Sequence, residues 1–290
     1  MINYYLNIKN LLNILMNTIY FNKNNIVLID SSYYVFHRYF ATYRWFSFQK
    51  IDVSTDDIIN NEVFINAFYK HINNDIKKIC KKWNTNKDNI VFCVDCQRTE
   101  IWRNDIYDTY KATRVQKNNF NKKIFSIFND YINSLGFKYL SQSRLEGDDV
   151  IYLSQKMIKT QLELLKNNDI NVVIITNDND FLQLVDARVL VYNMQFKELL
   201  KRGYNNPKTD LLFKAIYGDK SDNISKIGAG ITKEKALMIS NMTDDEREKY
   251  IKESGYEDKF KLNMKLISFE NIPTEYTEIF SNNVKIILED

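Results

Sequence analysis

Short apolar runs alternate with longer segments of helical periodicity over the first two-thirds of this 290-residue chain. The apolar runs have the length of buried strands and fall at 26–30, 90–95, 137–140, 171–176 and 188–192. Between them, apolar positions recur at helical spacing at 31–46, 56–83, 120–135 and 147–166. This alternation predicts an α/β fold with a mostly parallel central sheet flanked by helices.

The pattern changes after about residue 195, where helical segments joined by turns replace the strands. Pro207 stands at a position typical of a helix start, and Thr232 would cap a helix that follows a glycine-containing turn. We therefore expect three parts: an N-terminal extension over 1–24, an α/β core over 25–200 and a helical region over 201–290.

Two segments do not follow the alternation. Residues 97–123 are polar, basic and aromatic without a continuous apolar face, so we expect them to project as a loop or a weakly packed helix. The opening 21 residues are apolar-rich but interrupted by Asn and Lys. They suit an added amphipathic helix, or an upstream start before Met16, better than a secretory signal.

Acidic residues stand where the predicted strands end and where helices begin. Three of the predicted strands run into aspartates, and two further acidic groups fall in the motifs LEGDDV and YGDKSDNI. The nine carboxylates are Asp30, Asp95, Glu146, Asp148, Asp149, Asp178, Asp180, Asp219 and Asp222. Because the carboxyl ends of parallel strands meet at one edge of an open sheet, we expect these side chains to converge there.

A cleft with so many carboxylates needs cations, since like charges in a buried site cannot all stay ionised. An all-oxygen donor set suits Mg²⁺ or Mn²⁺ rather than zinc. Two divalent ions about 4 Å apart can activate a water molecule and stabilise the leaving oxygen of a phosphoryl displacement. The sequence therefore predicts two Mg²⁺ ions, for which Mn²⁺ could substitute.

The overall charge is unevenly distributed. The chain has a net charge of +3, but the residues other than those nine carboxylates together carry +12. A basic body around a metal-filled acidic pocket suits a polyanionic substrate, because it attracts phosphates. The less specific alternative is that these charges only form a solvated surface.

The three cysteines, Cys80, Cys93 and Cys96, do not form a disulfide framework by number or spacing, so we expect a reducing intracellular compartment, cytoplasm or nucleus. We interpret Cys93 as a core residue. No window has the apolar length of a membrane span. The abundance of Asn, Ile, Lys and Tyr is typical of an AT-rich genome and would suit a virus or phage.

In their order and spacing, the motifs resemble the structure-specific 5′-nucleases: flap endonucleases, phage 5′→3′ exonucleases and the 5′-nuclease domain of bacterial DNA polymerase I. The matching segments within 25–240 are LID, VDCQRTEIWRNDIYDTYKATR, LEGDDV, TNDNDFLQLV and YGDKSDNI. YKATR is similar to the family's arch segment, and GDKSDN to the start of its DNA-binding helix–hairpin–helix. The resemblance implies a PIN-like nuclease core, an arch at 97–123 and a C-terminal helix–hairpin–helix region.

The resemblance also implies roles for the acids. One ion would be held by Asp30, Asp95, Glu146 and Asp148. The other would be held or oriented by Asp148, Asp149, Asp178, Asp180 and Asp222. Asp219 matches the motif as well, although it could equally cap a turn.

Further roles fall on the arch and on the first helix. By the resemblance, Lys111 and Arg114 would engage the scissile phosphate and stabilise charge in the transition state. Phe36 matches a position where the family stacks an aromatic ring on a terminal base, although it could equally be a core side chain. We expect Tyr110 to contact DNA, and Arg103 to contact phosphate rather than the core.

The hairpin departs from the family's G-x-G pattern. It is IGAGITKEKA here, in which Thr232 replaces the second glycine with one residue inserted nearby. Gly228, Gly230 and Lys233 could still contact a duplex phosphate, because exposed backbone amides are what such a site needs. A K⁺ ion at these amides is a further expectation of the resemblance, which the departure weakens.

We therefore predict a divalent-metal-dependent 5′-nuclease that cuts near the 5′ end of branched, nicked or free-ended DNA, with RNA–DNA hybrids such as primers as further substrates. We expect a monomer that does not contact membranes, and no sliding-clamp peptide is recognisable. Two alternatives stay open. One is a ribonuclease with a related acidic core, against which GDKSDN argues. The other is a non-catalytic DNA-binding accessory protein of replication, against which the intact set of acids argues.

Overall fold

A five-stranded parallel sheet forms the centre of the computed structural model, which describes residues 18–49, 58–114 and 120–289. Its strand order is β4-β3-β2-β5-β6, and every neighbouring pair is parallel. The strands are β2 (Ile26–Asp30), β3 (Ile90–Cys93), β4 (Lys138–Leu140), β5 (Val172–Ile175) and β6 (Val189–Tyr192). The mostly parallel sheet expected from the alternation of strands and helices is confirmed.

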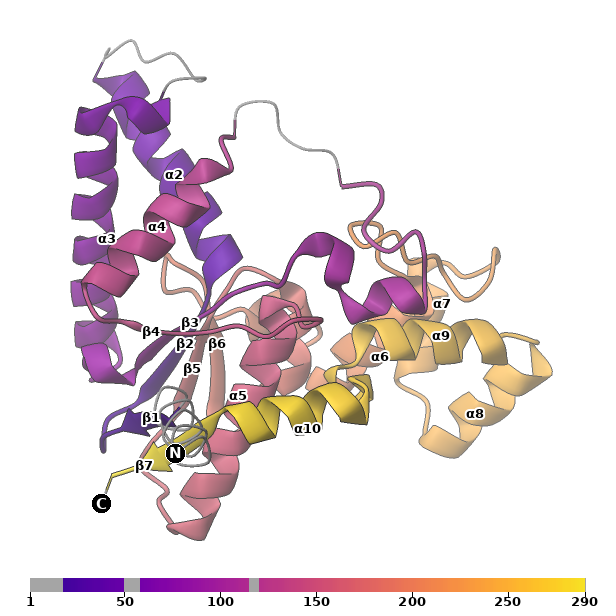
Figure 1. The fold of residues 1–290 in the computed structure, drawn as a ribbon. Coiled ribbons are helices and arrows are strands. Elements are labelled where there is room, and N and C mark those ends of the chain that lie inside the picture. Colours follow the sequence, from indigo (N-terminus) through magenta and orange to yellow (C-terminus); the bar gives the residue numbers. More distant parts are fainter. Residues whose placement is uncertain (1–17, 50–57, 115–119, 290) are drawn as a thin grey trace, which may run out of the picture.

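Helices cover both faces of this sheet, as Figure 1 shows. One face packs against α2 (Ser31–Phe48), α3 (Glu62–Lys82) and α4 (Lys123–Ser134), and the other against α5 (Gly147–Leu164). Within β2, Val27 and Ile29 belong to the first core and Ile26 and Leu28 to the second. Burial on both faces explains why the strands are continuous apolar runs rather than alternating ones.

The connections place a switch point at the carboxyl edge of the sheet. The chain moves outward from β2 to β3 and β4, and then crosses to the other side of β2 to form β5 and β6. Ligands of open α/β sheets bind in the crevice outside the strand ends at such a point. Asp30, at the end of β2, and the segment after β5 therefore border the expected site.

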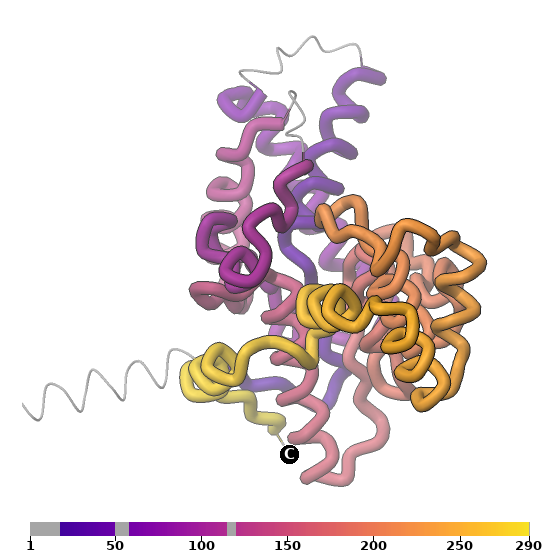
Figure 2. Tube along the Cα trace, turned by 90° about the vertical axis from the view of Figure 1, so that its right-hand side faces the viewer, coloured from indigo at the N-terminus to yellow at the C-terminus, as the bar shows by residue number. Residues whose placement is uncertain are grey.

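Four helices follow the sheet and gather beside it, orange to yellow in Figure 2. They are α6 (Pro207–Tyr217), α7 (Lys233–Ser240), α8 (Asp244–Glu253) and α9 (Glu257–Ile267). Pro207 occupies the first turn of α6, and the side chain of Thr232 accepts a hydrogen bond from the Lys235 amide at the start of α7. Both predicted helix starts are confirmed.

The last part of the chain returns to the core. Helix α10 (Thr274–Asn283) leads into β7 (Lys285–Leu288), which pairs in parallel with β1 (Thr18–Phe21). Ile19 of β1 is buried in the same core as α5. The sequence pattern did not predict this pairing between the expected N-terminal extension and the expected helical C-terminal region. Its two strands lie 264 residues apart, from Phe21 to Lys285, beyond the reach of local patterns.

Some expectations concern segments that the structure leaves undescribed. The helix proposed for the opening residues falls mostly on 1–17, and part of the arch falls on 115–119, both outside the described residues. Within the described part of the chain, no helix is long and apolar enough to cross a membrane.

Cys93 is 1% exposed in the core, which confirms its interpretation as a core residue.

Candidate active site

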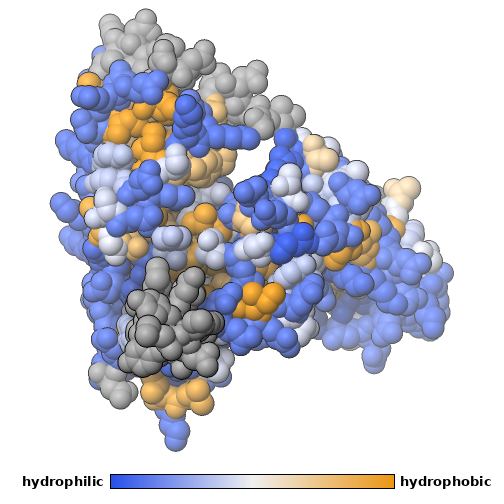
Figure 3. Space-filling view, in the orientation of Figure 1, coloured by the Kyte–Doolittle hydropathy of each residue, from blue (hydrophilic) through white to orange (hydrophobic). Residues whose placement is uncertain are grey.

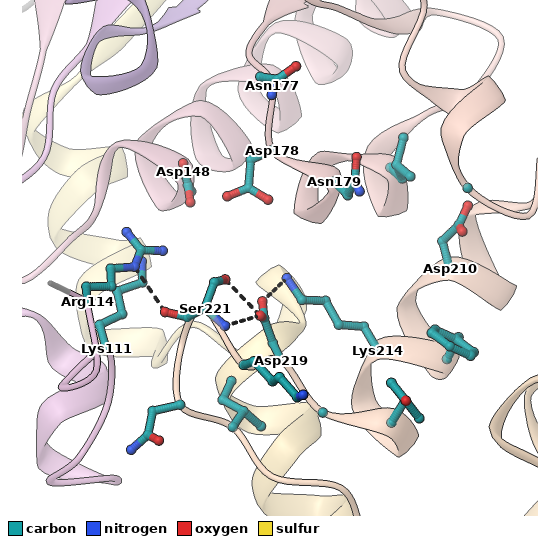
Figure 4. Close-up of a pocket in the computed structure, with 18 of the residues that line it drawn as sticks. Lys111, Arg114, Asp148, Asn177, Asp178, Asn179, Asp210, Lys214, Asp219 and Ser221 are labelled. Carbon is teal, nitrogen blue, oxygen red and sulfur yellow. Dashed lines mark hydrogen bonds and ion pairs between the residues drawn. The ribbon is translucent and has the colours of Figure 1, made fainter. Parts of the chain in front are cut away.

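A cavity of about 1450 Å³ opens at the carboxyl edge of the sheet, where the switch point lies. Its acidic lining comes from Asp30, Asp95, Glu146, Asp148, Asp178, Asp210 and Asp219. In Figure 4, Asp148 and Asp178 lie along one wall, while Lys111, Lys214 and Asp219 lie along the wall that faces them. We call this cavity the acidic pocket.

Asp30 and Asp95 are held at the ends of neighbouring strands by hydrogen bonds. Asp30 caps α2 by accepting from the Tyr33 amide at 2.9 Å, and its other oxygen accepts from the Thr176 hydroxyl at 2.8 Å. Asp95 accepts from the Gly147 amide at 2.6 Å and from the Ser32 hydroxyl. Both carboxylates are therefore fixed in direction before any ligand binds.

The motif LEGDDV forms the start of α5 beneath these strands. Gly147 packs so closely on the end of β3 that an added Cβ would lie 3.1 Å from Asp95 Oδ1 and 3.3 Å from the Cys93 carbonyl oxygen. Close approach explains the glycine and brings Glu146 and Asp148 to the pocket. The expectation that these two acids join Asp30 and Asp95 agrees with the geometry.

A second group of acids gathers at the side of the pocket that Asp219 lines, with Asp180 and Asp222 behind the lining. Asp180, Asp219 and Asp222 each offer one carboxylate oxygen, and these oxygens lie within 4.8 Å of one another. Asp219 also accepts from the Ser221 amide and hydroxyl, both at 2.7 Å. It therefore caps a turn and belongs to the acidic group at the same time.

Burial and mutual repulsion act on the carboxyl groups of the pocket. Burial and then the Asp95 carboxylate raise the pKa of Asp30 to about 7. Burial, followed by Asp30 and Asp178, raises the pKa of Asp148 well above its ordinary value, and burial also raises the pKa of Asp178. The ionised forms of these carboxyl groups are therefore destabilised, and a nearby cation would stabilise them.

Lys111 and Arg114 reach the pocket from the arch segment. Lys111 has a φ of +56°, in the left-handed region that non-glycine residues rarely occupy, and its Nζ lies 2.5 Å from Glu146 Oε1. Although burial acts to raise it, the Lys111 and Arg103 cations hold the pKa of Glu146 below its ordinary value. Arg114 donates to Asp222 Oδ1 at 2.6 Å. Both cations therefore stand beside the acids.

Arg103, Tyr110 and Asp149 differ from expectation. Arg103 is 3% exposed and donates to both oxygens of Asp149 at 2.8 Å, so its guanidinium lies in the core and not at a DNA surface. Tyr110 is 6% exposed, and its hydroxyl donates to Glu146 at 3.0 Å. Asp149 is directed at Arg103 and Trp102 rather than at the pocket. A buried carboxylate needs a charged partner, and here the arch segment supplies it.

For residues 101–103, the same contacts correct the expectation that 97–123 projects from the core. Ile101 and Trp102 are 4% and 1% exposed, and the Trp102 indole donates to Asp149 at 3.0 Å. Arg103 also donates to the Leu266 carbonyl at 2.8 Å, which ties this segment to the end of α9. The segment is polar when averaged over its length, and this average gave no indication that a short stretch of it is buried.

We expect Arg103→Met to lower the free energy of unfolding by about 3–5 kcal/mol, because it leaves the Asp149 carboxylate buried without its cation. Chemical denaturation followed by circular dichroism would measure this change.

The matched control is Arg144→Met, which removes a partly exposed ion pair with Asp105 and should cost at most about 1 kcal/mol. Replacing Asp149 by leucine in the Arg103→Met background should recover part of the loss. Equal stability of Arg103→Met and the wild type would contradict a structural role for this pair.

The remaining sequence-based candidates lie around the pocket mouth. Phe36 is 40% exposed, lines the pocket and stacks on Phe120 with 4.2 Å between ring centroids. Figure 3 shows apolar side chains over the same part of the molecule, along α2 and α4. Lys233 also lines the pocket, at the start of α7. Gly230 is exposed, and a Cβ added there would meet no atom within 4 Å beyond its chain neighbours.

Gly228 has a different environment from Gly230. A Cβ added at Gly228 would lie 2.4 Å from the Tyr256 ring, so this position requires glycine for packing. Contact of Gly228, Gly230 and Lys233 with DNA stays a prediction.

Three residues that the sequence did not single out contribute to the site, and two of them, Arg202 and Lys214, line the pocket. Thr176 orients Asp30, Arg202 donates to Asn177 at 2.7 Å, and Lys214 forms ion pairs with Asp180 and Asp219. Lys214 precedes the GDKSDN motif by only four residues, so a longer motif would have included it. For Thr176 and Arg202, no neighbouring motif in the sequence indicates a place in the site.

The donor set of the pocket fits hard divalent cations. Its carboxylates supply only oxygen ligands, and one of them, Asp219, converges with Asp180 and Asp222 within the span of one coordination sphere. The raised pKa values of Asp30, Asp148 and Asp178 show where positive charge would be most stabilising. Three expected ligands, Asp149, Asp180 and Asp222, are not part of the pocket lining, and the contacts of Asp149 direct it at Arg103 instead.

Curated proteins similar to this chain are exonucleases and polymerases. DNA polymerase I of Lactococcus lactis subsp. lactis is 26% identical over 220 residues, which are 71% of this chain and 23% of the polymerase. The 5′-3′ exonuclease of Buchnera aphidicola is 29% identical over 215 residues, 71% of this chain and 66% of that protein. The chain thus spans about a quarter of the polymerase and about two thirds of the exonuclease.

Solved structures with the same fold include the bacteriophage T5 flap endonuclease in a complex with DNA and metal ions. It has a TM-score of 0.57 and 14% identity, and the match covers 89% of this chain and 97% of that one. The T5 5′-exonuclease with bound zinc has a TM-score of 0.55 and 15% identity, with the same coverage.

The family model for the 5′-3′ exonuclease N-terminal resolvase-like domain matches residues 25–209, more than half of the chain. This stretch contains the whole parallel sheet and most of the acidic pocket, and the match confirms the resemblance carried by the motifs. The chain therefore belongs to the 5′-3′ exonuclease family.

Proposed function

We propose that this protein is a divalent-metal-dependent 5′-nuclease that hydrolyses phosphodiesters near the 5′ end of branched, nicked or free-ended DNA. The observation that carries this proposal is the convergence of acids from three strand ends and one helix start on a pocket that also receives Lys111 and Arg114. Family membership supports the same chemistry. Nuclease action needs both parts, because the acids hold cations and the basic side chains hold phosphate.

Mg²⁺ would be held in two places. Asp30, Asp95, Glu146 and Asp148 would hold one ion, and Asp178, Asp180, Asp219 and Asp222 would hold or orient the other. When bound, such ions activate water and stabilise the leaving oxygen of the displacement.

The chain's own residues would position the phosphodiester. Lys111 and Arg114 lie beside Glu146 and Asp222, so each can transfer its hydrogen bond to a phosphate that enters the pocket. Hydrogen bonds from Thr176 and Gly147 hold Asp30 and Asp95 in place, which limits the reorganisation that substrate binding requires.

The defining experiment is to incubate the protein with 5′-labelled flap, nicked and RNA–DNA hybrid substrates, with and without Mg²⁺, and to map the product ends. We expect Mg²⁺-dependent cuts close to the 5′ end of the branched substrate. The same preparation carrying Asp178→Ala controls for contaminating nuclease.

The substrate arms of this assay separate the alternatives. A ribonuclease would cut the RNA strand and leave the DNA flap intact. A DNA-binding accessory protein would retain the flap in a gel-shift assay without cutting it. Lys233 and the loop between α6 and α7 add basic side chains to the pocket lining, which suits a polyanionic partner.

Phe36 offers a prediction about the unpaired 5′ end. We expect Phe36→Ala to weaken binding of substrates with an unpaired terminal base by about 1–3 kcal/mol, because its half-exposed ring can stack on a base. Fluorescence anisotropy with flap substrates that carry a base or an abasic site at the 5′ end would measure this.

The matched control is Phe48→Ala, on the same helix, where the ring is 83% exposed and does not line the pocket. It should leave affinity unchanged, and Phe36→Trp should retain it. If Phe36→Ala weakens the base-bearing and abasic substrates equally, the ring does not act by stacking.

A further inference from the structure

Lys214 is placed inside the acidic group at the side of the pocket that Asp219 lines. It extends from α6, its side chain is 19% exposed, and its Nζ lies 2.6 Å from Asp219 Oδ2. The same ammonium forms an ion pair with Asp180. Figure 4 shows this side chain reaching along the pocket wall to Asp219.

The carboxylates that Lys214 bridges belong to the group that converges. Asp180, Asp219 and Asp222 bring one oxygen each within 4.8 Å of one another. Asp222 is compensated separately, by Arg114 at 2.6 Å and by Lys111 at 3.8 Å. Asp180 and Asp219 both pair with Lys214, so the ammonium lies against two of the three carboxylates that converge.

An ammonium and a divalent ion compete for these carboxylates. A Mg²⁺ ion binds carboxylate oxygens at about 2.0–2.1 Å, which is closer than the 2.6 Å between Lys214 Nζ and Asp219 Oδ2, and the two cations repel each other strongly over such a distance. We propose that Lys214 is an internal competitor for the divalent cation, which holds Asp180 and Asp219 together until an ion displaces it. The inference rests on the proposed function, because that function supplies the ion.

Once an ion displaces the Lys214 ammonium from Asp180 and Asp219, the side chain still lies at the wall of the pocket that the substrate would enter. An ordinary phosphate-gripping lysine would instead have no effect on ion binding in the absence of DNA. The two roles therefore differ in an experiment that contains no DNA.

The test is a Mn²⁺ titration of the metal-free protein, with free Mn²⁺ followed by electron paramagnetic resonance and binding checked by calorimetry. We expect Lys214→Met to bind Mn²⁺ about tenfold more tightly than the wild type, since one neighbouring charge shifts cation binding at a carboxylate by about one log unit or more. Lys214→Arg, which keeps the charge, should stay within about threefold of the wild type.

The matched control is Lys208→Met. Lys208 lies on the same helix, but it is 63% exposed and pairs with Asp244 at 2.8 Å, outside the pocket. Its replacement removes one positive charge and should change Mn²⁺ affinity by less than about twofold, because exposed charges are screened by salt.

Thermal unfolding gives a second measurement. Without divalent ions, Lys214→Met should melt below the wild type, because Asp180 and Asp219 lose their common partner. Mn²⁺ should then raise the melting temperature of Lys214→Met more than that of the wild type. The larger Mn²⁺-induced rise is the part that identifies a competitor, because loss of the two ion pairs lowers the melting temperature in either role.

The outcomes separate the two proposals. Saturable Mn²⁺ binding of equal affinity in the wild type and in Lys214→Met would overturn the competitor role and leave the nuclease proposal standing. Absence of saturable binding in every variant would overturn the metal site, and the competitor role with it.

Discussion

Replacing Asp178 by alanine is expected to abolish cleavage, with the single-turnover rate falling on the order of a thousandfold or more. Asp178 interacts electrostatically with Asp30 and Asp148 on one side and with Asp219 and Asp222 on the other. It therefore borders both groups of acids, and its loss would weaken both ion positions. DNA affinity should stay the same or rise, because repulsion towards the phosphates falls.

The matched control for this prediction is Asp186→Ala. Asp186 precedes β6 at the opposite edge of the sheet and pairs there with Lys159. Its replacement should leave the cleavage rate unchanged. Wild-type turnover by Asp178→Ala at saturating Mg²⁺ would remove the basis for placing ions in this pocket.

The second large effect is expected at Lys111. Lys111→Ala should lower the single-turnover rate about a hundredfold or more, the scale of losing one charge contact in the transition state. Its Nζ lies 2.5 Å from Glu146 Oε1, inside the pocket rather than at the outer DNA surface, so substrate affinity should change much less. Lys111→Arg should recover only part of the rate, because the two cations differ in shape and hydration.

Rate and affinity must be measured on the same substrate, by quenched-flow cleavage and by fluorescence anisotropy. Lys159→Ala removes the partner of Asp186 and serves as the matched lysine control, with neither quantity expected to change. If Lys111→Ala weakens binding while the bound complex still cuts at full speed, Lys111 belongs only to the DNA grip.

The sequence predicted the sheet and the strand-end acids because both depend on local patterns. Val27 to Ile29 form an unbroken apolar run that ends at Asp30, and parallel strands bring such ends to one edge. The same argument placed Asp178 correctly at the pocket. For these residues, the local pattern of the sequence was sufficient to predict their position in the structure.

The parts that were not predicted depend on partners that lie far apart in the sequence. Arg103 is separated from Asp149 by 46 residues, and nothing near either residue indicates that they pair. The arch segment therefore appeared too polar for the core, although the positive charge of Arg103 is neutralised by Asp149 inside the core. Lys214 was missed for a related reason, since one lysine on a helix is ordinarily a solvated residue.

The β1–β7 pair has a consequence for how the protein is made. Thr18 lies beside Lys285 in the register of these strands, so β1 leaves the ribosome long before its partner exists. Until then, Ile19 and Phe21 lack the cover that Phe280 and Ile286 give them in the finished core. Closing so long a loop is slow and costs chain entropy, so we expect this corner to be completed last, after the parallel sheet has formed. A nascent chain would thus have the acids of its strand ends in place while the apolar side chains of its first strand are still exposed.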